Sequence, residues 1–116
     1  NVDAHWSLAL LATLSNRPNE AAKEFAALEE LLPKNPWPSA YRSLVTLAGW
    51  NPWGAKEIAD AAQEKHKHPI FLGLSDMSAI FTGALWHLPN ASESIPKTIQ
   101  KIEEEMQASD KNSTKS

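Results

Sequence analysis

Histidines are the side chains best suited to acid–base or metal chemistry in this sequence of 116 residues, and there are four of them. His66 and His68 stand two apart in KHKHP. Such a pair faces one way on a strand, but the two side chains diverge on a helix, where a shared metal ion is out of reach. Because the segment follows a helical pattern, we interpret residues 65–68 as cations at a helix C-terminus, which the helix dipole favours.

The remaining candidates for catalysis are weaker still. His5 and His87 are single histidines beside tryptophans, without a carboxylate at ligand spacing. The stretch GLSDM at 73–77 is not a nucleophile elbow, and neither a zinc-protease motif nor a glycine-rich phosphate loop occurs. The sequence therefore predicts a protein that is not an enzyme, with no catalytic residue, no metal site and no cofactor.

Composition describes an ordinary globular chain. Lys and Arg number 11 against 14 Asp and Glu, for a net charge of −3, and they form no basic stripe of the kind that binds nucleic acid. Cysteine is absent, which excludes disulfides and thiolate zinc sites. No apolar run approaches the roughly 18 residues of a membrane span, so we expect no membrane insertion. Asn1 indicates a processed protein or an excised domain, and the compartment, cytoplasmic or periplasmic, stays open.

Asn-Pro-Trp occurs twice, at 35–37 and 51–53, on either side of one apolar segment. Proline lacks an amide hydrogen, so both tripeptides predict corners between helices. We expect the tryptophans at these corners, with Trp50 and Trp86, to fill gaps at helix ends. The alternative is that they are exposed platforms for carbohydrate or for a membrane interface.

Hydrophobic periodicity predicts helices along most of the chain. Asp3, Ser39 and Ser75 are expected as N-caps of three of them. Residues 109–116 contain no apolar side chain and are expected to form a disordered tail. The expected helices are 3–14, 20–32, 40–50, 55–67, 76–88 and 95–107.

An internal repeat organises these helices. DAHWSLALLATL (3–14) aligns with SAYRSLVTLAGW (39–50) at a spacing of 36, and AKEFA (22–26) aligns with AKEIA (55–59) at 33. We therefore predict one all-α domain over 1–108, built from three antiparallel helical hairpins at about 3–33, 39–68 and 75–108. The third is the most degenerate.

The first hairpin resembles a tetratricopeptide repeat, in which small residues on the first helix precede a small–aromatic–proline series on the second. The second hairpin keeps only part of the pattern, with Ala59 where a bulky residue belongs. The resemblance implies a right-handed superhelical array whose first helices line a concave, peptide-binding face. The residues that match the repeat pattern are Ala9, Ala21, Phe25, Leu28, Pro33, Ala55, Ala59 and Ala62.

We accordingly expect a scaffold that docks a peptide or helix of a partner protein on this face, with Arg42 as its polar contact. An alternative is a structural domain that self-associates through residues 3–14, where leucines occupy nearly every side of the helix. A small-ligand binder or helical enzyme using His66 or His87 is a third possibility. The partner-binding candidates are Trp6, Leu10, Arg42, Thr46, Ser78 and Thr82.

Overall fold

The computed structural model describes residues 2–83 and 88–115, and within them it contains six helices and no strand. This confirms the predicted all-helical class. The helices are α1 (Val2–Leu14), α2 (Pro18–Leu31), α3 (Trp37–Ala48), α4 (Pro52–His66), α5 (Ile70–Phe81) and α6 (Leu88–Lys115).

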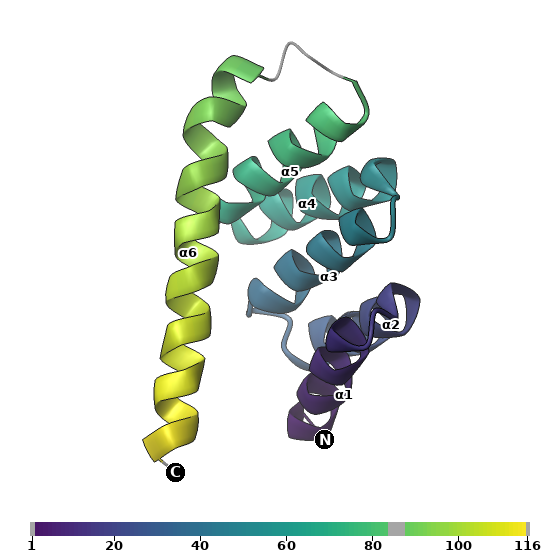
Figure 1. Ribbon diagram of the computed structural model, residues 1–116, viewed down its shortest axis with the longest axis vertical. Coiled ribbons are helices and arrows are strands. Elements are labelled where there is room, and N and C mark those ends of the chain that lie inside the picture. Colours follow the sequence, from purple (N-terminus) through teal and green to yellow (C-terminus); the bar gives the residue numbers. More distant parts are fainter. Residues whose placement is uncertain (1, 84–87, 116) are drawn as a thin grey trace.

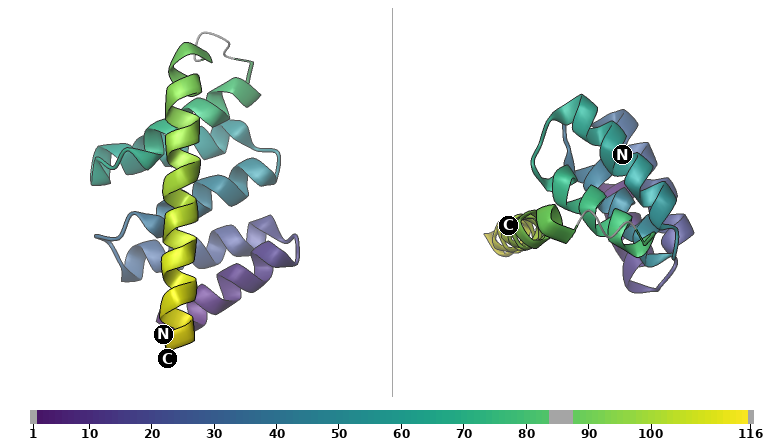
Figure 2. Two further views of the ribbon diagram at one scale, coloured as in Figure 1. Left: turned by 60° about the vertical axis from the view of Figure 1, so that its left-hand side comes forward. Right: turned by 90° about the horizontal axis from the view of Figure 1, so that it is seen from above.

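Helices α1 to α5 form a stack in which each helix packs against the next one in sequence (Figure 1). Helix α3 also touches α5. The long α6 packs against α5 and then runs beside the stack towards its opposite end, as the two views of Figure 2 show. No helix in the described ranges is both long and apolar enough to cross a membrane.

The turns α1–α2 and α3–α4 have the same backbone conformation. Asn16 and Trp50 are both left-handed, with φ of 58° and 63°. Arg17 and Asn51 follow at φ/ψ of −118°/73° and −120°/73°, and each precedes the proline that begins the next helix. Corresponding residues of the two turns stand 34 apart in the sequence, so the first two hairpins repeat with that spacing.

The buried residues of the first two helix pairs recur at the same spacing of 34. Ala9 on α1 and Ser43 on α3 are both buried, again 34 residues apart. This corrects the spacings of 36 and 33 that the sequence matches suggested. The matches align small residues that lie on different sides of their helices: Ala40 is buried whereas Ala4 is exposed. On the second helices the buried equivalents are Ala21 and Ala55, Phe25 and Ala59, and Leu28 and Ala62.

At both Asn-Pro-Trp corners the asparagine side chain accepts a hydrogen bond from an amide in the first turn of the next helix. Asn35 Oδ1 accepts from Trp37 N at 2.9 Å, and Asn51 Oδ1 accepts from Gly54 N at 3.0 Å. These bonds satisfy amides that a helix N-terminus leaves without an intrahelical partner. The predicted caps at Ser39 and Ser75 are wrong, because Ser39 is buried in the first turn of α3 and Ser75 lies inside α5.

Other helix boundaries also differ from those expected. Helix α5 begins at Ile70, so the segment IFLGL is part of it, and α1 begins at Val2, which places Asp3 in its first turn. Helix α6 includes Pro96 in its interior and continues to Lys115. Residues 109–115 are thus helical where a disordered tail was expected, since no Pro or Gly after Pro96 interrupts a helix already nucleated upstream.

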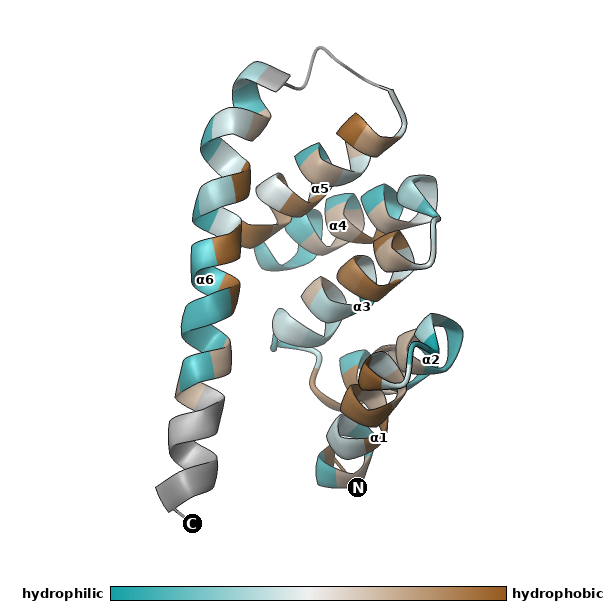
Figure 3. Ribbon diagram, viewed as in Figure 1, coloured by the Kyte–Doolittle hydropathy of each residue, from teal (hydrophilic) through white to brown (hydrophobic). Residues whose placement is uncertain are grey.

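A close contact joins α6 to the stack. Thr98 is buried on α6, and its Oγ1 donates to the Ile70 carbonyl of α5 at 3.3 Å. Gly73 lies opposite, and a Cβ built there would stand 1.9 Å from Thr98 Oγ1. Ser94 Oγ also donates to Asp76 Oδ2 at 2.6 Å. The hydrophobic residues of α6 lie on the side turned towards the other helices (Figure 3).

Candidate functional site

An apolar groove lies between the C-terminal half of α3, the α3–α4 turn and the last turns of α5. Its volume is about 350 Å³, and none of the described residues that line it is charged. Figure 3 shows the hydrophobic residues of α3 and of the end of α5 that border this region. The lining residues are Leu44, Leu47, Ala48, Trp50, Pro52, Met77 and Phe81.

The turn geometry positions the tryptophans beside this groove. The left-handed backbone of Trp50 projects its ring outward, and 82% of that residue is exposed. Trp53 follows in the first turn of α4 and is 66% exposed. Both were expected to fill gaps at helix ends, and both expectations are wrong because most of each residue is open to solvent. Trp37 does pack inward, with ring centroids 5.9 Å from Tyr41 and 6.1 Å from His68.

Two of the residues predicted for a first-helix face, Trp6 and Arg42, make contacts with other helices of the stack. Trp6 packs edge-on against Phe25 and Tyr41, at centroid distances of 5.9 and 6.1 Å. Arg42 was expected to be an isolated cation, but its Nε lies 2.7 Å from Glu29 Oε1 on α2. These side chains connect α1, α2 and α3 to one another.

The hydroxyl candidates are likewise occupied within their own helices. Ser78 is buried, and its Oγ donates to the Leu74 carbonyl at 2.8 Å. Thr46 and Thr82 donate to the carbonyls of Arg42 and Ala79, at 2.7 and 2.6 Å. Leu10 alone among the six candidates is a large apolar side chain exposed to solvent.

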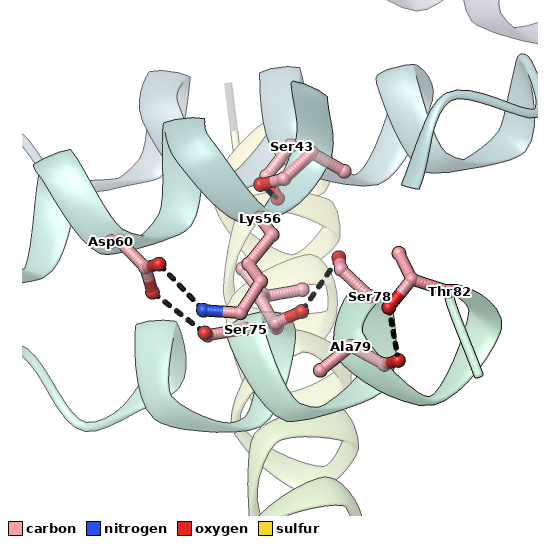
Figure 4. A network of polar contacts seen from close by, with 9 residues as sticks. Ser43, Lys56, Asp60, Ser75, Ser78, Ala79 and Thr82 are labelled. Carbon is pink, nitrogen blue, oxygen red and sulfur yellow. Dashed lines mark hydrogen bonds and ion pairs between the residues drawn. The ribbon is translucent and has the colours of Figure 1, made fainter. Parts of the chain in front are cut away.

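Figure 4 shows a network of polar contacts on α4 and α5, in which the bond from Ser75 to Asp60 joins the two helices. Asp60 accepts from Lys56 Nζ at 2.7 Å and from Ser75 Oγ at 2.6 Å. Ser43 Oγ donates to the Ala55 carbonyl at 2.9 Å, joining α3 to α4. The serines of this network therefore act as structural donors.

Two histidines form part of a chain of aromatic contacts. His66 stacks on Phe71 at 6.0 Å, and His68 lies 6.5 Å from the same ring. Burial lowers the pKa of His68, and Lys101 of α6 lowers it further. His68 Nδ1 accepts from Ile70 N at 3.3 Å, which fits a neutral ring at the start of α5.

Burial also lowers the pKa of His66, with a further lowering from Lys65, although Glu29 acts in the opposite direction. His5 makes a contact that sequence spacing does not reveal, since its Nδ1 lies 2.6 Å from Glu24 Oε2, 19 residues away. Within 2–83 and 88–115 no group of three or more His, Asp or Glu could hold a metal ion. Trp86 and His87 lie outside the described residues.

Comparisons with family models, with curated proteins and with solved structures found no match to this chain. Evidence for function therefore comes from its own surfaces. The apolar groove combines a sizeable volume, an uncharged lining and an exposed tryptophan.

Proposed function

We propose that this chain is a non-enzymatic docking domain, resembling a short tetratricopeptide array, that binds an apolar segment of a partner protein in the α3–α5 groove. The occupant is a peptide or amphipathic helix whose apolar anchor residues enter the groove. The observation that carries this proposal is the uncharged groove of about 350 Å³ beside the exposed Trp50. Exposed apolar surface of this kind is typical of recognition sites.

The lining favours a peptide over a small metabolite. Small-molecule pockets usually place a few polar groups that fix the ligand's orientation, whereas this groove is lined by aliphatic, aromatic and proline side chains. A partner helix brings its own backbone hydrogen bonds and needs only apolar contact for its anchor residues. Trp50 and Phe81 are the expected energetic anchors, because large aromatic side chains dominate most interfaces.

The internal repeat supplies a second apolar position. At the 34-residue spacing Leu10 of α1 corresponds to Leu44 of the groove. Leu10 is exposed, so an extended partner has a further apolar contact on the first helix. Of the residues expected from sequence, Leu10 thus remains part of the proposed surface.

The test uses a displayed library of helical peptides, selected on the wild-type domain and measured by fluorescence anisotropy. Trp50→Ala and Phe81→Asp should each weaken the selected peptides on the order of 10- to 30-fold, as loss of an interface hot spot does. Trp53→Ala is the matched control for Trp50→Ala. Trp53 is also exposed and stands three residues further along the chain, but it does not line the groove. Leu31→Asp, at an exposed leucine on α2, is the control for the second.

Both controls should bind within about twofold of wild type, as expected for positions outside an interface. The proposal fails if the controls lose as much affinity as the groove variants, or if the selected peptides bind both groove variants normally. Backbone amide shifts of α3 and α5 should report the bound peptide. Shifts confined to α1 and α2 would assign the binding to another surface.

A further inference from the structure

Helix α1 exposes an apolar face at one end of the stack. Its buried residues, Ala9 and Ala12, pack towards α2. Ser7, Leu11 and Leu14 recur at spacings of four and three and lie on the opposite side of the helix. Leu11 is 56% exposed and Leu14 is 86% exposed. In Figure 1 this helix lies at the lower end of the stack formed by α1 to α5.

The same short motif packs tightly elsewhere in this chain. Residues 40–44 read Ala-Tyr-Arg-Ser-Leu, and residues 4–8 read Ala-His-Trp-Ser-Leu. In α3 the motif's alanine and serine are buried against α4, and Ser43 Oγ donates to a carbonyl of that neighbouring helix at 2.9 Å. In α1 the same alanine and serine are exposed. The 34-residue register pairs Ser43 with the buried Ala9, so the Ala-x-x-Ser-Leu sequence of α1 lies on the face that α2 leaves uncovered.

This exposed face is complementary to itself in an antiparallel arrangement. A second α1 running in the opposite direction places Leu11 over Ser7 and Leu14 over Ala4, so large side chains meet small ones in both halves. The two pairs are centred at the same level of the helix, as a two-fold axis requires. A parallel arrangement sets leucine against leucine and small residue against small residue.

We propose that two copies of this chain associate through antiparallel contact of their α1 helices, with Leu11 and Leu14 seated over Ser7 and Ala4 of the partner copy. The α3–α5 groove lies on other helices, so a failure of the dimer leaves groove binding in place; of the proposed docking surface only Leu10 is on α1. An α1 of 13 residues is about 20 Å long. Contact over a single helix of that length falls at the small end of specific interfaces, so we expect a weak dimer, with a dissociation constant on the order of 10–100 µM.

Analytical ultracentrifugation of the 116-residue chain tests the association over roughly 1–300 µM, a range that brackets the expected constant. Wild type should pass from monomer to dimer, and Leu11→Glu with Leu14→Glu should remain monomeric. Leu31→Glu, at an exposed leucine on α2, and Phe81→Asp, in the groove, should dimerise as wild type does. Circular dichroism checks that all four proteins are equally helical.

Disulfide trapping tests the direction of the helices, and the chain is suited to it because it contains no cysteine. Single variants Ser7→Cys and Leu11→Cys are mixed and oxidised, and the products are separated by mass. The antiparallel contact predicts mainly the mixed 7–11 disulfide, with few 7–7 or 11–11 products.

Three results would overturn the proposal. A wild-type chain that stays monomeric throughout the concentration range has no such interface. Predominant 7–7 and 11–11 disulfides would require a parallel or random contact. Association abolished by Phe81→Asp but retained by the α1 double variant would place the interface in the groove.

Discussion

Replacing Gly73 with alanine should separate α6 from the helix stack. The added Cβ would lie 1.9 Å from Thr98 Oγ1, 2.5 Å from Thr98 Cβ and 2.8 Å from the Ser94 carbonyl oxygen. Ordinary contacts of a Cβ begin near 3.4 Å, so turning the Thr98 hydroxyl away is not enough. The Ser94 oxygen belongs to the backbone, and α6 itself must move.

The expected cost is at the upper end of the range for an overpacked core, about 3 kcal/mol. Part of that cost is the lost bond from Thr98 Oγ1 to the Ile70 carbonyl. Because the damage is confined to the α5–α6 contact, amide exchange should accelerate in α6 and the last helices of the stack before it does so in α1 and α2.

Urea unfolding, followed by circular dichroism, gives the loss in free energy of unfolding. Hydrogen exchange shows which helices open more readily. Gly49→Ala is the matched control: its Cβ would meet Pro18 at 3.4 Å, and its φ of −82° suits alanine. That variant should remain within about 0.5 kcal/mol of wild type, as substitutions without a clash do. A Gly73→Ala protein as stable as the control would refute the inferred contact, and Thr98→Gly in the Gly73→Ala background should restore part of the loss.

Three further outcomes follow from the contacts. Burial lowers the pKa of His68, so its folded-state pKa lies below the unfolded value of 6.5; stability should therefore fall as the pH drops below about 6.5, since the unfolded chain takes up the proton more readily. His68→Asn keeps an acceptor near Ile70 N and should weaken the dependence of the free energy of unfolding on pH, measured by urea unfolding. An unchanged dependence would mean that other groups cause it. Asn51→Ala removes the bond to Gly54 N and should cost about 1 kcal/mol in thermal unfolding, whereas Asn19→Ala, at an exposed site in the first turn of α2, should cost less. A double-mutant cycle on Arg42 and Glu29 should give a coupling of about 0.5–1 kcal/mol that weakens in salt, and zero coupling would mean that Arg42 is available to partners.

Sequence patterns identified the helical class and most of the corners for local physical reasons. Proline removes an amide donor and disfavours the helix that precedes it, so the corners at Asn35 and Asn51 were predictable, although Pro96 is accommodated within α6. Residues that match the tetratricopeptide pattern on the second helices, such as Phe25 and Ala59, are buried in α2 and α4. The start of α5 was missed because IFLGL contains apolar residues at almost every position, a pattern that does not distinguish a buried helix from a linker.

The candidate site was harder to predict because it depends on which residues of different helices meet. Arg42 looked isolated, since Glu29 lies on another helix and 13 residues away. Trp50 looked like a core residue, since aromatic side chains usually find cover. The groove that Met77 and Phe81 share with α3 needed the packing of α5 on α3, and neither residue stood out in the sequence.

By itself the sequence determined that this chain is helical and where its proline corners fall. These properties depend on backbone chemistry and on periodicity within one helix. Tertiary structure decided the 34-residue register of the repeat, the exposure of Trp50 and the pairing of Arg42 with Glu29. Such properties depend on which helix covers which face, and a residue's identity does not state whether a neighbour will cover it.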